Sequence, residues 1–526
     1  MYKLVELNKE LAQNSISLLD GITLNFELSF MLFGYAVNIN LPYIFLIAVD
    51  LAVFVISIIT MFHYSFYAGK LTTGHRLETM IKHTNYLLIL VFIFLSILIL
   101  SIFVSNPFSA EQSLYFFGGL YSISLTKLIL KLFVLGIWLV WLNFFTLQRL
   151  AGIEDSLVLS TLALAIAFSL ISINHLVLLF LSLEGFSLIL YVLATTGKQF
   201  GGTTAATQYF IFGSFGSIML LLGISILYEA SGIMSLSSWE LVNLSGAVGM
   251  IKPYTLGAGF IALGLLLKFG AAPLHGWVVE VYSNLPYYLM WFYSIFVKII
   301  IGIVMFRVIS AIPTFGVLEY FGIISLVIGC LGALRQSEIK KFFAYGSIMH
   351  VGFLLLSDMV SFQIYLITYV LSMVIIGLVI TNIRINGQEI VYLSDLGTSV
   401  GKSPASLIIM LFIAMLSVSG IPPLAGFWGK YSVFISLFTN SGSGSLLSLT
   451  AVSIAVAATM LAFFYYFRLL TWICLGFNGS KAMLAGSPSI FSTNNLVTML
   501  AIFVIIILFG FGFILHSYID LFINSW

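Results

Sequence analysis

Long apolar runs recur along the whole chain. Each run holds about 20 residues with few polar positions, which is the length that a helix needs to cross a lipid bilayer. We count about fourteen such runs, centred near residues 52, 95, 135, 165, 185, 218, 266, 297, 325, 349, 372, 418, 461 and 505. A transmembrane β-barrel would instead alternate apolar and polar residues over about ten positions. The pattern therefore predicts an all-α polytopic membrane protein with about fourteen transmembrane helices.

The composition agrees with a membrane protein and leaves little room for cofactors. Of the 526 residues, 61% are hydrophobic and 8% are charged, whereas soluble domains carry about 25% charged residues. The formal net charge of +2 gives no reason to expect nucleic acid. Cys330 and Cys474 have no partner at metal-ligand or CxxC spacing, and no Gly-rich nucleotide loop or pair of haem histidines stands out. We therefore expect contact with membrane lipids and no cofactor or metal in this chain.

A few charged residues interrupt the predicted spans. A charge at the bilayer centre costs about 2.5 to 3.5 kcal/mol unless it faces protein or water, so these residues call for a function. The structural alternative is an ion pair, but a pair between Glu184 and one of the three lysines inside the spans would leave the other two lysines unexplained. Lys127 and Lys131 lie near the start of a span, and we expect them to snorkel to the interface. The residues well inside a span are Glu184, Lys268, Lys298 and Lys430.

Two proline motifs resemble each other. The sequence reads GAAPLHGW at residues 270–277 and GIPPLAGF at residues 420–427. Pro273, Pro422 and Pro423 predict broken helices, in which water and freed carbonyls could reach the nearby lysines. The motifs fall in the seventh and twelfth spans, an odd number of spans apart, so their topologies are opposite. Paired broken helices in an inverted repeat indicate the central site of a transporter.

Several longer motifs carry a family resemblance. NHLVLLFLSLEGFSLILYVLATT, GLLLKFGAAPLHGWVVEVYSNLP, ALRQSEIKKFFAYGSIMHVGFLLL and SGIPPLAGFWGKYSVF together resemble the antiporter-like membrane subunits of respiratory complex I (NADH:ubiquinone oxidoreductase), and within them the subunit 2, or subunit N, family. Glu280 stands where that family usually has aspartate. The resemblance implies two inverted five-helix repeats with broken helices 7 and 12. It divides the chain into about three spans in residues 1–150, repeats in 151–312 and 313–482, and a last span in 483–526.

The same resemblance assigns a function to the buried charges. It implies that Glu184, Lys268, Lys298 and Lys430 move protons across the membrane, coupled to electron transfer in other subunits. Removal of a lysine from water favours the neutral amine, whereas a neighbouring carboxylate favours the ammonium, so a Glu/Lys pair has two states of similar energy. His350 and His275 are candidate intermediates; a packed core histidine is the alternative for each.

The resemblance also implies partners. NADH, FMN, iron–sulfur clusters and ubiquinone would belong to partner subunits, and other antiporter-like subunits would be neighbours. A subunit of a cation/proton antiporter and a structural subunit that carries no protons are the alternatives. With 48 phenylalanines and no transit peptide, we expect the mitochondrial inner membrane; a bacterial plasma membrane is the alternative.

Overall fold

The computed structural model describes most of the central part of the chain. It covers residues 30–32, 35–37, 41–67, 89–91, 93, 114–146, 153–197, 201–244, 253–312, 316–385, 388–400, 405–441 and 446–479. The predicted span near residue 505 and the predicted C-terminal segment 483–526 lie outside these ranges, as does most of the span near residue 95.

The chain divides into two compact units, Met1–Ala52 and Val53–Trp526. In the first unit, β1 (Phe30–Leu32) and β2 (Tyr35–Val37) form a short antiparallel hairpin. Helix α2 (Leu41–Tyr67) begins in this unit and continues into the second.

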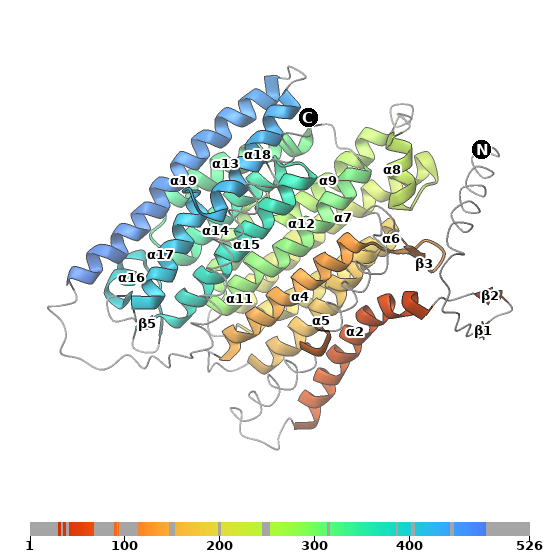
Figure 1. The fold of residues 1–526 in the computed structure, drawn as a ribbon, viewed down its shortest axis with the longest axis horizontal. Helices are drawn as coiled ribbons and strands as arrows, with labels where there is room; N and C mark the ends of the chain where they lie inside the picture. The colour runs from red at the N-terminus through yellow and green to blue at the C-terminus, as the bar shows by residue number, and fades with distance from the viewer. Residues whose placement is uncertain are drawn as a thin grey trace. The chain divides into compact units, whose positions relative to one another are not determined.

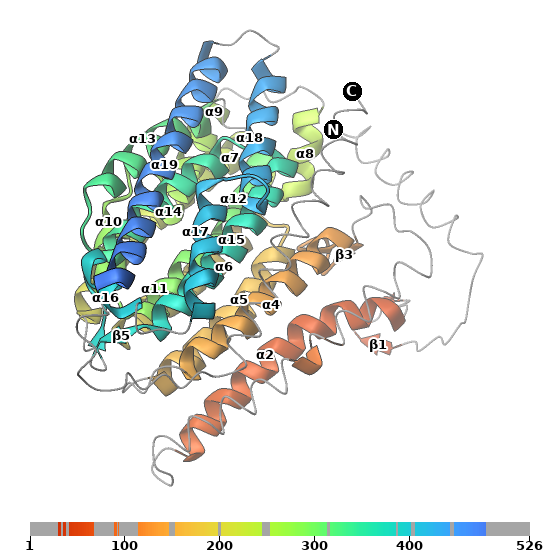
Figure 2. The ribbon, with the colours of Figure 1, turned by 60° about the vertical axis from the view of Figure 1, so that its left-hand side comes forward.

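The second unit is a bundle of helices whose long axes run nearly parallel (Figure 1). In Figure 2, α13 and α19 lie at one side of this bundle and α4 at the other. Among the described residues, eight helices are long and apolar enough to cross a membrane. After α2, the first helices of the second unit are α4 (Leu125–Thr146), α5 (Ile153–Ser172), α6 (Leu176–Thr195), α7 (Gly202–Ser231), α8 (Leu236–Leu244), α9 (Tyr254–Phe269), α10 (Gly276–Asn284), α11 (Tyr287–Phe292), the π-helix η3 (Tyr293–Val297) and α12 (Lys298–Ala311).

A second series of helices follows in the chain, and the second unit also holds two small hairpins, one before α4 and one within this second series. The hairpins are β3 (Leu114–Phe116) with β4 (Tyr121–Ile123), and β5 (Arg384–Ile385) with β6 (Gln388–Glu389). The helices are α13 (Val317–Arg335), α14 (Ile339–Leu355), α15 (Met359–Asn382), α16 (Leu393–Val400), α17 (Ala405–Ser419), α18 (Ala425–Ser441) and α19 (Leu446–Gly479). The prediction of a helical multi-pass membrane protein is confirmed.

Glycines bring two pairs of helices into close contact. A Cβ at Gly223 on α7 would lie 2.7 Å from the carbonyl oxygen of Gly257 on α9, and a Cβ at Gly264 on α9 would lie 2.7 Å from the carbonyl oxygen of Gly216 on α7. On α14, a Cβ at Gly352 would lie 2.9 Å from the carbonyl oxygen of Gly322 on α13. Small residues at such crossings let helix backbones approach where the hydrophobic effect cannot drive helices together.

Both proline motifs interrupt a helix. Helix α9 ends at Phe269 and α10 begins at Gly276, while α17 ends at Ser419 and α18 begins at Ala425. Gly270 (φ 78°) and Gly420 (φ 90°) end α9 and α17 in the left-handed conformation, which glycine adopts without steric cost. Each break thus begins at a residue whose backbone only glycine accommodates easily.

The placement of Lys131 differs from the prediction. Its side chain is fully buried, with Nζ 5.6 Å from the centroid of the Tyr121 ring and 5.9 Å from that of Phe168. The expectation that Lys131 snorkels to the interface is therefore wrong, because the hairpin strand β4 and helix α5 cover it. Lys127, four residues earlier, is half-buried and donates hydrogen bonds to the hydroxyl and carbonyl of Ser122.

Candidate functional site

Glu184 and Lys268 form an ion pair between α6 and α9. Lys268 Nζ lies 3.3 Å from Glu184 Oε2 and donates a second hydrogen bond to Ser187 Oγ at 3.0 Å. Ser187 follows Glu184 by three residues, so both side chains project from one face of α6. The Lys268 side chain is 6% exposed and that of Glu184 is 29% exposed. The ammonium is thus enclosed within the bundle, whereas the carboxylate can be reached from outside the chain.

The first helix break does not solvate Lys268 as predicted. The freed carbonyl of Leu267 accepts a hydrogen bond from Trp277 Nε1 at 3.1 Å, and the carbonyl of Leu266 accepts from Gly270 and Ala271. Among the described residues, Lys268 donates to the side chains of Glu184 and Ser187 and to no freed carbonyl, so the expectation that freed carbonyls reach it is wrong. The break instead reaches across the bundle, where the Ala272 N–H donates to Ser325 Oγ on α13 at 2.8 Å.

Lys298 lies directly after the π-helix η3 and is 5% exposed. Its Nζ donates to the carbonyl of Ser347 on α14 at 2.9 Å. Within the described part of the chain, no carboxylate lies within ion-pair distance of Lys298. A π-helical turn inside an α-helix is frequent at functional sites, and here it precedes a buried cation held by a single carbonyl.

Lys430 on α18 is held by the second helix break. Its Nζ donates to the carbonyl of Ser419 at 2.8 Å and lies 5.6 Å from the centroid of the Phe353 ring. Ser419 is the last residue of α17, so its carbonyl is one that the break frees. Lys430 is 3% exposed and, like Lys298, has no carboxylate partner among the residues that the structure describes. Here, in contrast to Lys268, a freed carbonyl does bind a buried lysine.

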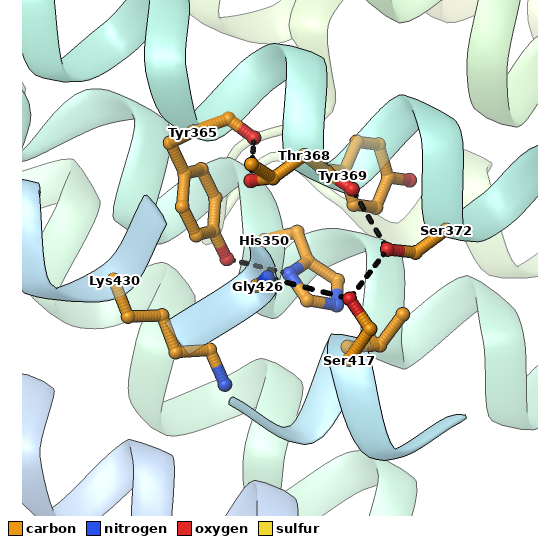
Figure 3. A pocket seen from close by; sticks show the side chains of 9 residues that line it. His350, Tyr365, Thr368, Tyr369, Ser372, Ser417, Gly426 and Lys430 are labelled. Carbon is orange, nitrogen blue, oxygen red and sulfur yellow. Dashed lines mark hydrogen bonds between the residues drawn. The ribbon is translucent and has the colours of Figure 1, made fainter. Parts of the chain in front are cut away.

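A small cavity lies between Lys430 and His350 (Figure 3). It leaves about 10 Å³ for the centre of a water molecule, which is close to the space that one water needs. Hydroxyl groups from α15 and α17 and the Lys430 ammonium supply its polar surface. The lining residues are His350, Tyr365, Thr368, Tyr369, Ser372, Ser417, Val418, Gly426 and Lys430.

His350 is 2% exposed, and both of its ring nitrogens are hydrogen-bonded. Nδ1 lies 2.6 Å from the Tyr365 hydroxyl on α15, and Nε2 lies 3.2 Å from the Tyr466 hydroxyl on α19. His350 stands three residues after Ser347 on α14, about 4.5 Å along the helix axis, so it is close to the carbonyl that holds Lys298.

The remaining predicted residues lie in the helix breaks. His275 is half-buried immediately before α10, where its Nδ1 lies 3.1 Å from the carbonyl oxygen of Pro273 and its ring centroid 6.4 Å from that of Tyr345. No hydrogen bond joins His275 to a buried lysine. Pro273, Pro422 and Pro423 are exposed, and the Ala272–Pro273 and Pro422–Pro423 bonds are cis.

Sequence reasoning missed the neutral partners of the lysines and of His350. Ser187, Ser347, Tyr365 and Tyr466 are ordinary residues in apolar runs, and no motif distinguishes them. Ser187 alone had a local signal, because it lies one helical turn after Glu184. Within the described ranges, no three His, Cys, Asp or Glu side chains come together in a way that could hold a metal ion.

Comparisons with known proteins agree on one family. Residues 173–455 match the profile of the family described as "NADH:quinone oxidoreductase/Mrp antiporter, TM". The chain is 33% identical over 343 residues to NADH-ubiquinone oxidoreductase chain 2 of Marchantia polymorpha, a match that covers 62% of this chain and 68% of the relative. It is 34% identical over 304 residues to NADH-quinone oxidoreductase subunit 14 of Thermus thermophilus, covering 57% and 66% of the two chains. The matches thus span about two thirds of the length of these relatives.

A solved structure is similar over more of the chain. A chain of respiratory complex I from Thermus thermophilus with bound aureothin superposes with a TM-score of 0.68 at 26% identity. The superposition covers 88% of this chain and 96% of the other. The family match over residues 173–455 includes both helix breaks and all four buried charged residues.

Proposed function

The chain belongs to the antiporter-like membrane subunits of respiratory complex I, in the subunit 2 (subunit N) family, and we propose that it moves protons along Glu184, Lys268, Lys298 and Lys430. The observation that carries this proposal is the Glu184–Lys268 pair, in which a buried ammonium has one carboxylate partner that can be reached from outside the chain. A charge that arrives beside Glu184 can weaken the pair without entering the bundle. Lys268 then holds its proton less firmly and can release it.

The two other lysines continue the path. Lys298 and Lys430 are buried and each is bound by a carbonyl oxygen, which accepts a hydrogen bond from either the ammonium or the neutral amine. Such a partner stabilises the lysine without fixing its charge, as a proton carrier requires. We propose that protons pass from Lys268 through Lys298 to Lys430, and that Lys430 releases them toward the outer side of the membrane.

The proposed division of the chain into spans and repeats is based on the two helix breaks. We propose fourteen spans, with inverted repeats in residues 151–312 and 313–482, flanked by 1–150 and 483–526. Similar breaks after Phe269 and Ser419 support this division. Lys268 lies in the helix before its break, whereas Lys430 lies in the helix after its break. The two proposed repeats therefore place their lysines on opposite sides of a similar helix break.

Partners would supply everything that this chain lacks. We propose that NADH, FMN, iron–sulfur clusters and ubiquinone bind in other subunits of the complex, and that other antiporter-like subunits and lipids contact the apolar outer faces of the bundle. The proposed location is the mitochondrial inner membrane, since one relative is named as a ubiquinone oxidoreductase chain; the bacterial relative keeps a plasma membrane open.

Replacement of Lys268 by alanine in the assembled complex tests the function. We expect the complex to assemble, because the Glu184 side chain is 29% exposed and can turn outward to water. NADH-driven proton uptake by vesicles should fall by at least about ten-fold, as expected when a positioned proton carrier is lost. Lys341→Ala is the matched control, since Lys341 lies at the surface in an i,i+3 pair with Glu338. Wild-type uptake in the Lys268→Ala complex would overturn the proposal.

Purification separates this function from that of a cation/proton antiporter subunit. The proposed function requires that the chain co-purifies with an assembly that oxidises NADH. An antiporter subunit would exchange cations for protons in vesicles without NADH.

A further inference from the structure

Two cations converge on one serine hydroxyl at an end of the bundle. Lys127 Nζ donates to Ser122 Oγ and, at 3.2 Å, to the Ser122 carbonyl. Arg307 Nη2 donates to the same Oγ at 3.4 Å, and its Nη1 donates to the carbonyl of Ile171 at 3.0 Å. Among the residues that the structure describes, neither the exposed Glu240 on α8 nor any other carboxylate lies within ion-pair distance of either cation. The hydrogen-bond partners of both cations are therefore neutral.

The pair has hydrogen-bond donors to spare. An ammonium has three N–H donors and a guanidinium has five, and the bonds to Ser122 and Ile171 occupy two of each. One N–H of Lys127 and three of Arg307 thus have no acceptor within the described ranges. Both side chains are half-buried, so a ligand can reach them. Such a pair suits an oxyanion that accepts several hydrogen bonds, and a guanidinium binds phosphate with a fork of two.

The pair lies at the depth of lipid headgroups. Lys127 is the third residue of a candidate membrane span that begins at Leu125. Arg307 stands four residues before Ala311, the end of another such span. At a rise of about 1.5 Å per residue, the two backbones lie about 3 to 6 Å inside the apolar segments. The head of Lys127 reaches back five residues to Ser122, so it points toward the membrane surface.

Apolar side chains are exposed around the same end of the bundle. Phe117 and Leu120, in the turn between β3 and β4, are exposed, and so is Ile129 on α4. Strand β4 carries Ser122, and Ile129 follows Lys127 by two residues. Apolar surface beside unused phosphate donors is the pattern that an amphipathic anion requires.

We propose that Lys127 and Arg307 bind the phosphate of an anionic membrane phospholipid, whose acyl chains lie against the β3–β4 hairpin and α4. Basic pockets between membrane helices attract anionic headgroups, whereas a zwitterionic headgroup carries its own cation beside the phosphate. Lys131, one turn further along α4, is fully buried and takes no part. Arg307 follows Lys298 by nine residues, about 13 Å along α12. The inference is thus independent of the proposed proton path.

Photolabelling of the assembled complex tests the site. The complex is placed in phosphatidylcholine vesicles that contain a trace of photoactivatable phosphatidylglycerol, and labelled peptides are identified by mass spectrometry. We expect label on residues 114–129, and much less label there from photoactivatable phosphatidylcholine. Equal labelling by the two lipids would overturn the site. If inorganic phosphate alone suppresses the label, the pair binds a free anion and the lipid assignment is wrong.

Variants show whether the two cations cause the labelling. Lys127→Gln and Arg307→Gln remove one charge each and keep a hydrogen-bond donor. We expect label from phosphatidylglycerol to fall by at least about ten-fold in each, because a hydrogen bond to a charged group contributes about that factor or more to binding. Lys341→Gln is the matched control, since Lys341 is also the third residue of its helix and lies outside the site. Unchanged label in Lys127→Gln and Arg307→Gln would overturn the proposal.

Two further measurements keep the test decisive. Arg307→Lys retains the charge without the fork, so it should lose only part of the label, and it replaces Arg307→Gln if that variant does not assemble. A zero-length carbodiimide cross-linker joins amines to carboxylates in direct contact. If it joins Lys127 of the wild-type complex to another subunit, the pair binds an acidic protein segment and the lipid site is refuted.

Discussion

Gly420→Ala tests whether the second helix break holds Lys430 in place. Gly420 has a φ of 90°, and a Cβ there would lie 2.9 Å from Lys430 Cδ and 3.3 Å from Lys430 Nζ. The left-handed backbone costs an alanine about 1 to 2 kcal/mol. Carbon atoms pack best at about 3.5 to 4.0 Å, so the lysine stem must also move away by roughly half an ångström or more.

That movement removes the ammonium from its acceptor. Lys430 Nζ is 2.8 Å from the Ser419 carbonyl, and a hydrogen bond to a charged group contributes about 1.5 to 3 kcal/mol. Added to the backbone cost, this gives a destabilisation of about 2.5 to 5 kcal/mol. We expect less of the assembled complex to survive a heat step on a native gel, and NADH-driven proton uptake per surviving complex to fall.

Gly276→Ala is the matched control in the other break. Gly276 has no positive φ, and a Cβ there would meet nothing within 4 Å, so its change should stay within about 0.5 kcal/mol. If Gly420→Ala is as stable as Gly276→Ala and takes up protons at the wild-type rate, the break does not determine the position of Lys430 and our reading of its geometry is wrong.

The same Glu→Gln substitution should lower proton uptake at one ion pair and heat resistance at another. In Glu184→Gln, a Coulomb attraction of about 5 kcal/mol at an effective dielectric constant near 20, acting over 3.3 Å, is lost while the amide still fits. Assembly should remain normal and proton uptake should fall relative to an exposed control, Glu280→Gln; equal uptake in both would refute the coupling role. In Glu389→Gln, the 3.0 Å pair with Lys340, whose two side chains are 14% and 11% exposed, loses one partner, which costs about 3 to 5 kcal/mol for a buried pair. Heat resistance of the assembled complex should drop, whereas the surface control Glu338→Gln should change it little; equal resistance would show that the pair is not structural.

The sequence predicted the charged residues better than their surroundings. Glu184 and Lys268 were identified because a charge inside an apolar run is conspicuous, and the helix breaks because proline and glycine act locally. The neutral partners could not be identified in this way. Ser347 holds Lys298 from 49 residues away and Tyr466 reaches His350 from 116 residues away, so these contacts depend on the tertiary structure and not on local sequence.

Lys131 and Lys268 show where local reasoning fails. Snorkelling was expected for Lys131 from its position near a helix end, but the β3–β4 hairpin folds over that end. Carbonyl solvation was expected for Lys268 from its distance to Pro273, but the Trp277 indole takes the freed oxygen of Leu267. In both cases a contact between two secondary-structure elements determines the surroundings of the lysine. The geometry of a single helix does not predict such a contact.

The bond between the Ala272 N–H and Ser325 Oγ has a consequence for ion selectivity. It fastens the backbone of one break to a helix of the other proposed repeat. Lys340 Nζ, which pairs with Glu389 within its own repeat, adds a second attachment by donating to the carbonyl of Leu285. A carrier that rocks its halves apart would have to break these attachments in every cycle. Protons alone can cross a scaffold that stays closed, because they move by exchange of hydrogen bonds and by rotation of side chains, which takes picoseconds to nanoseconds where side chains are free to turn. A hydrated sodium or potassium ion needs an open passage, so we expect attachments of this kind to favour protons over larger cations in the proposed path.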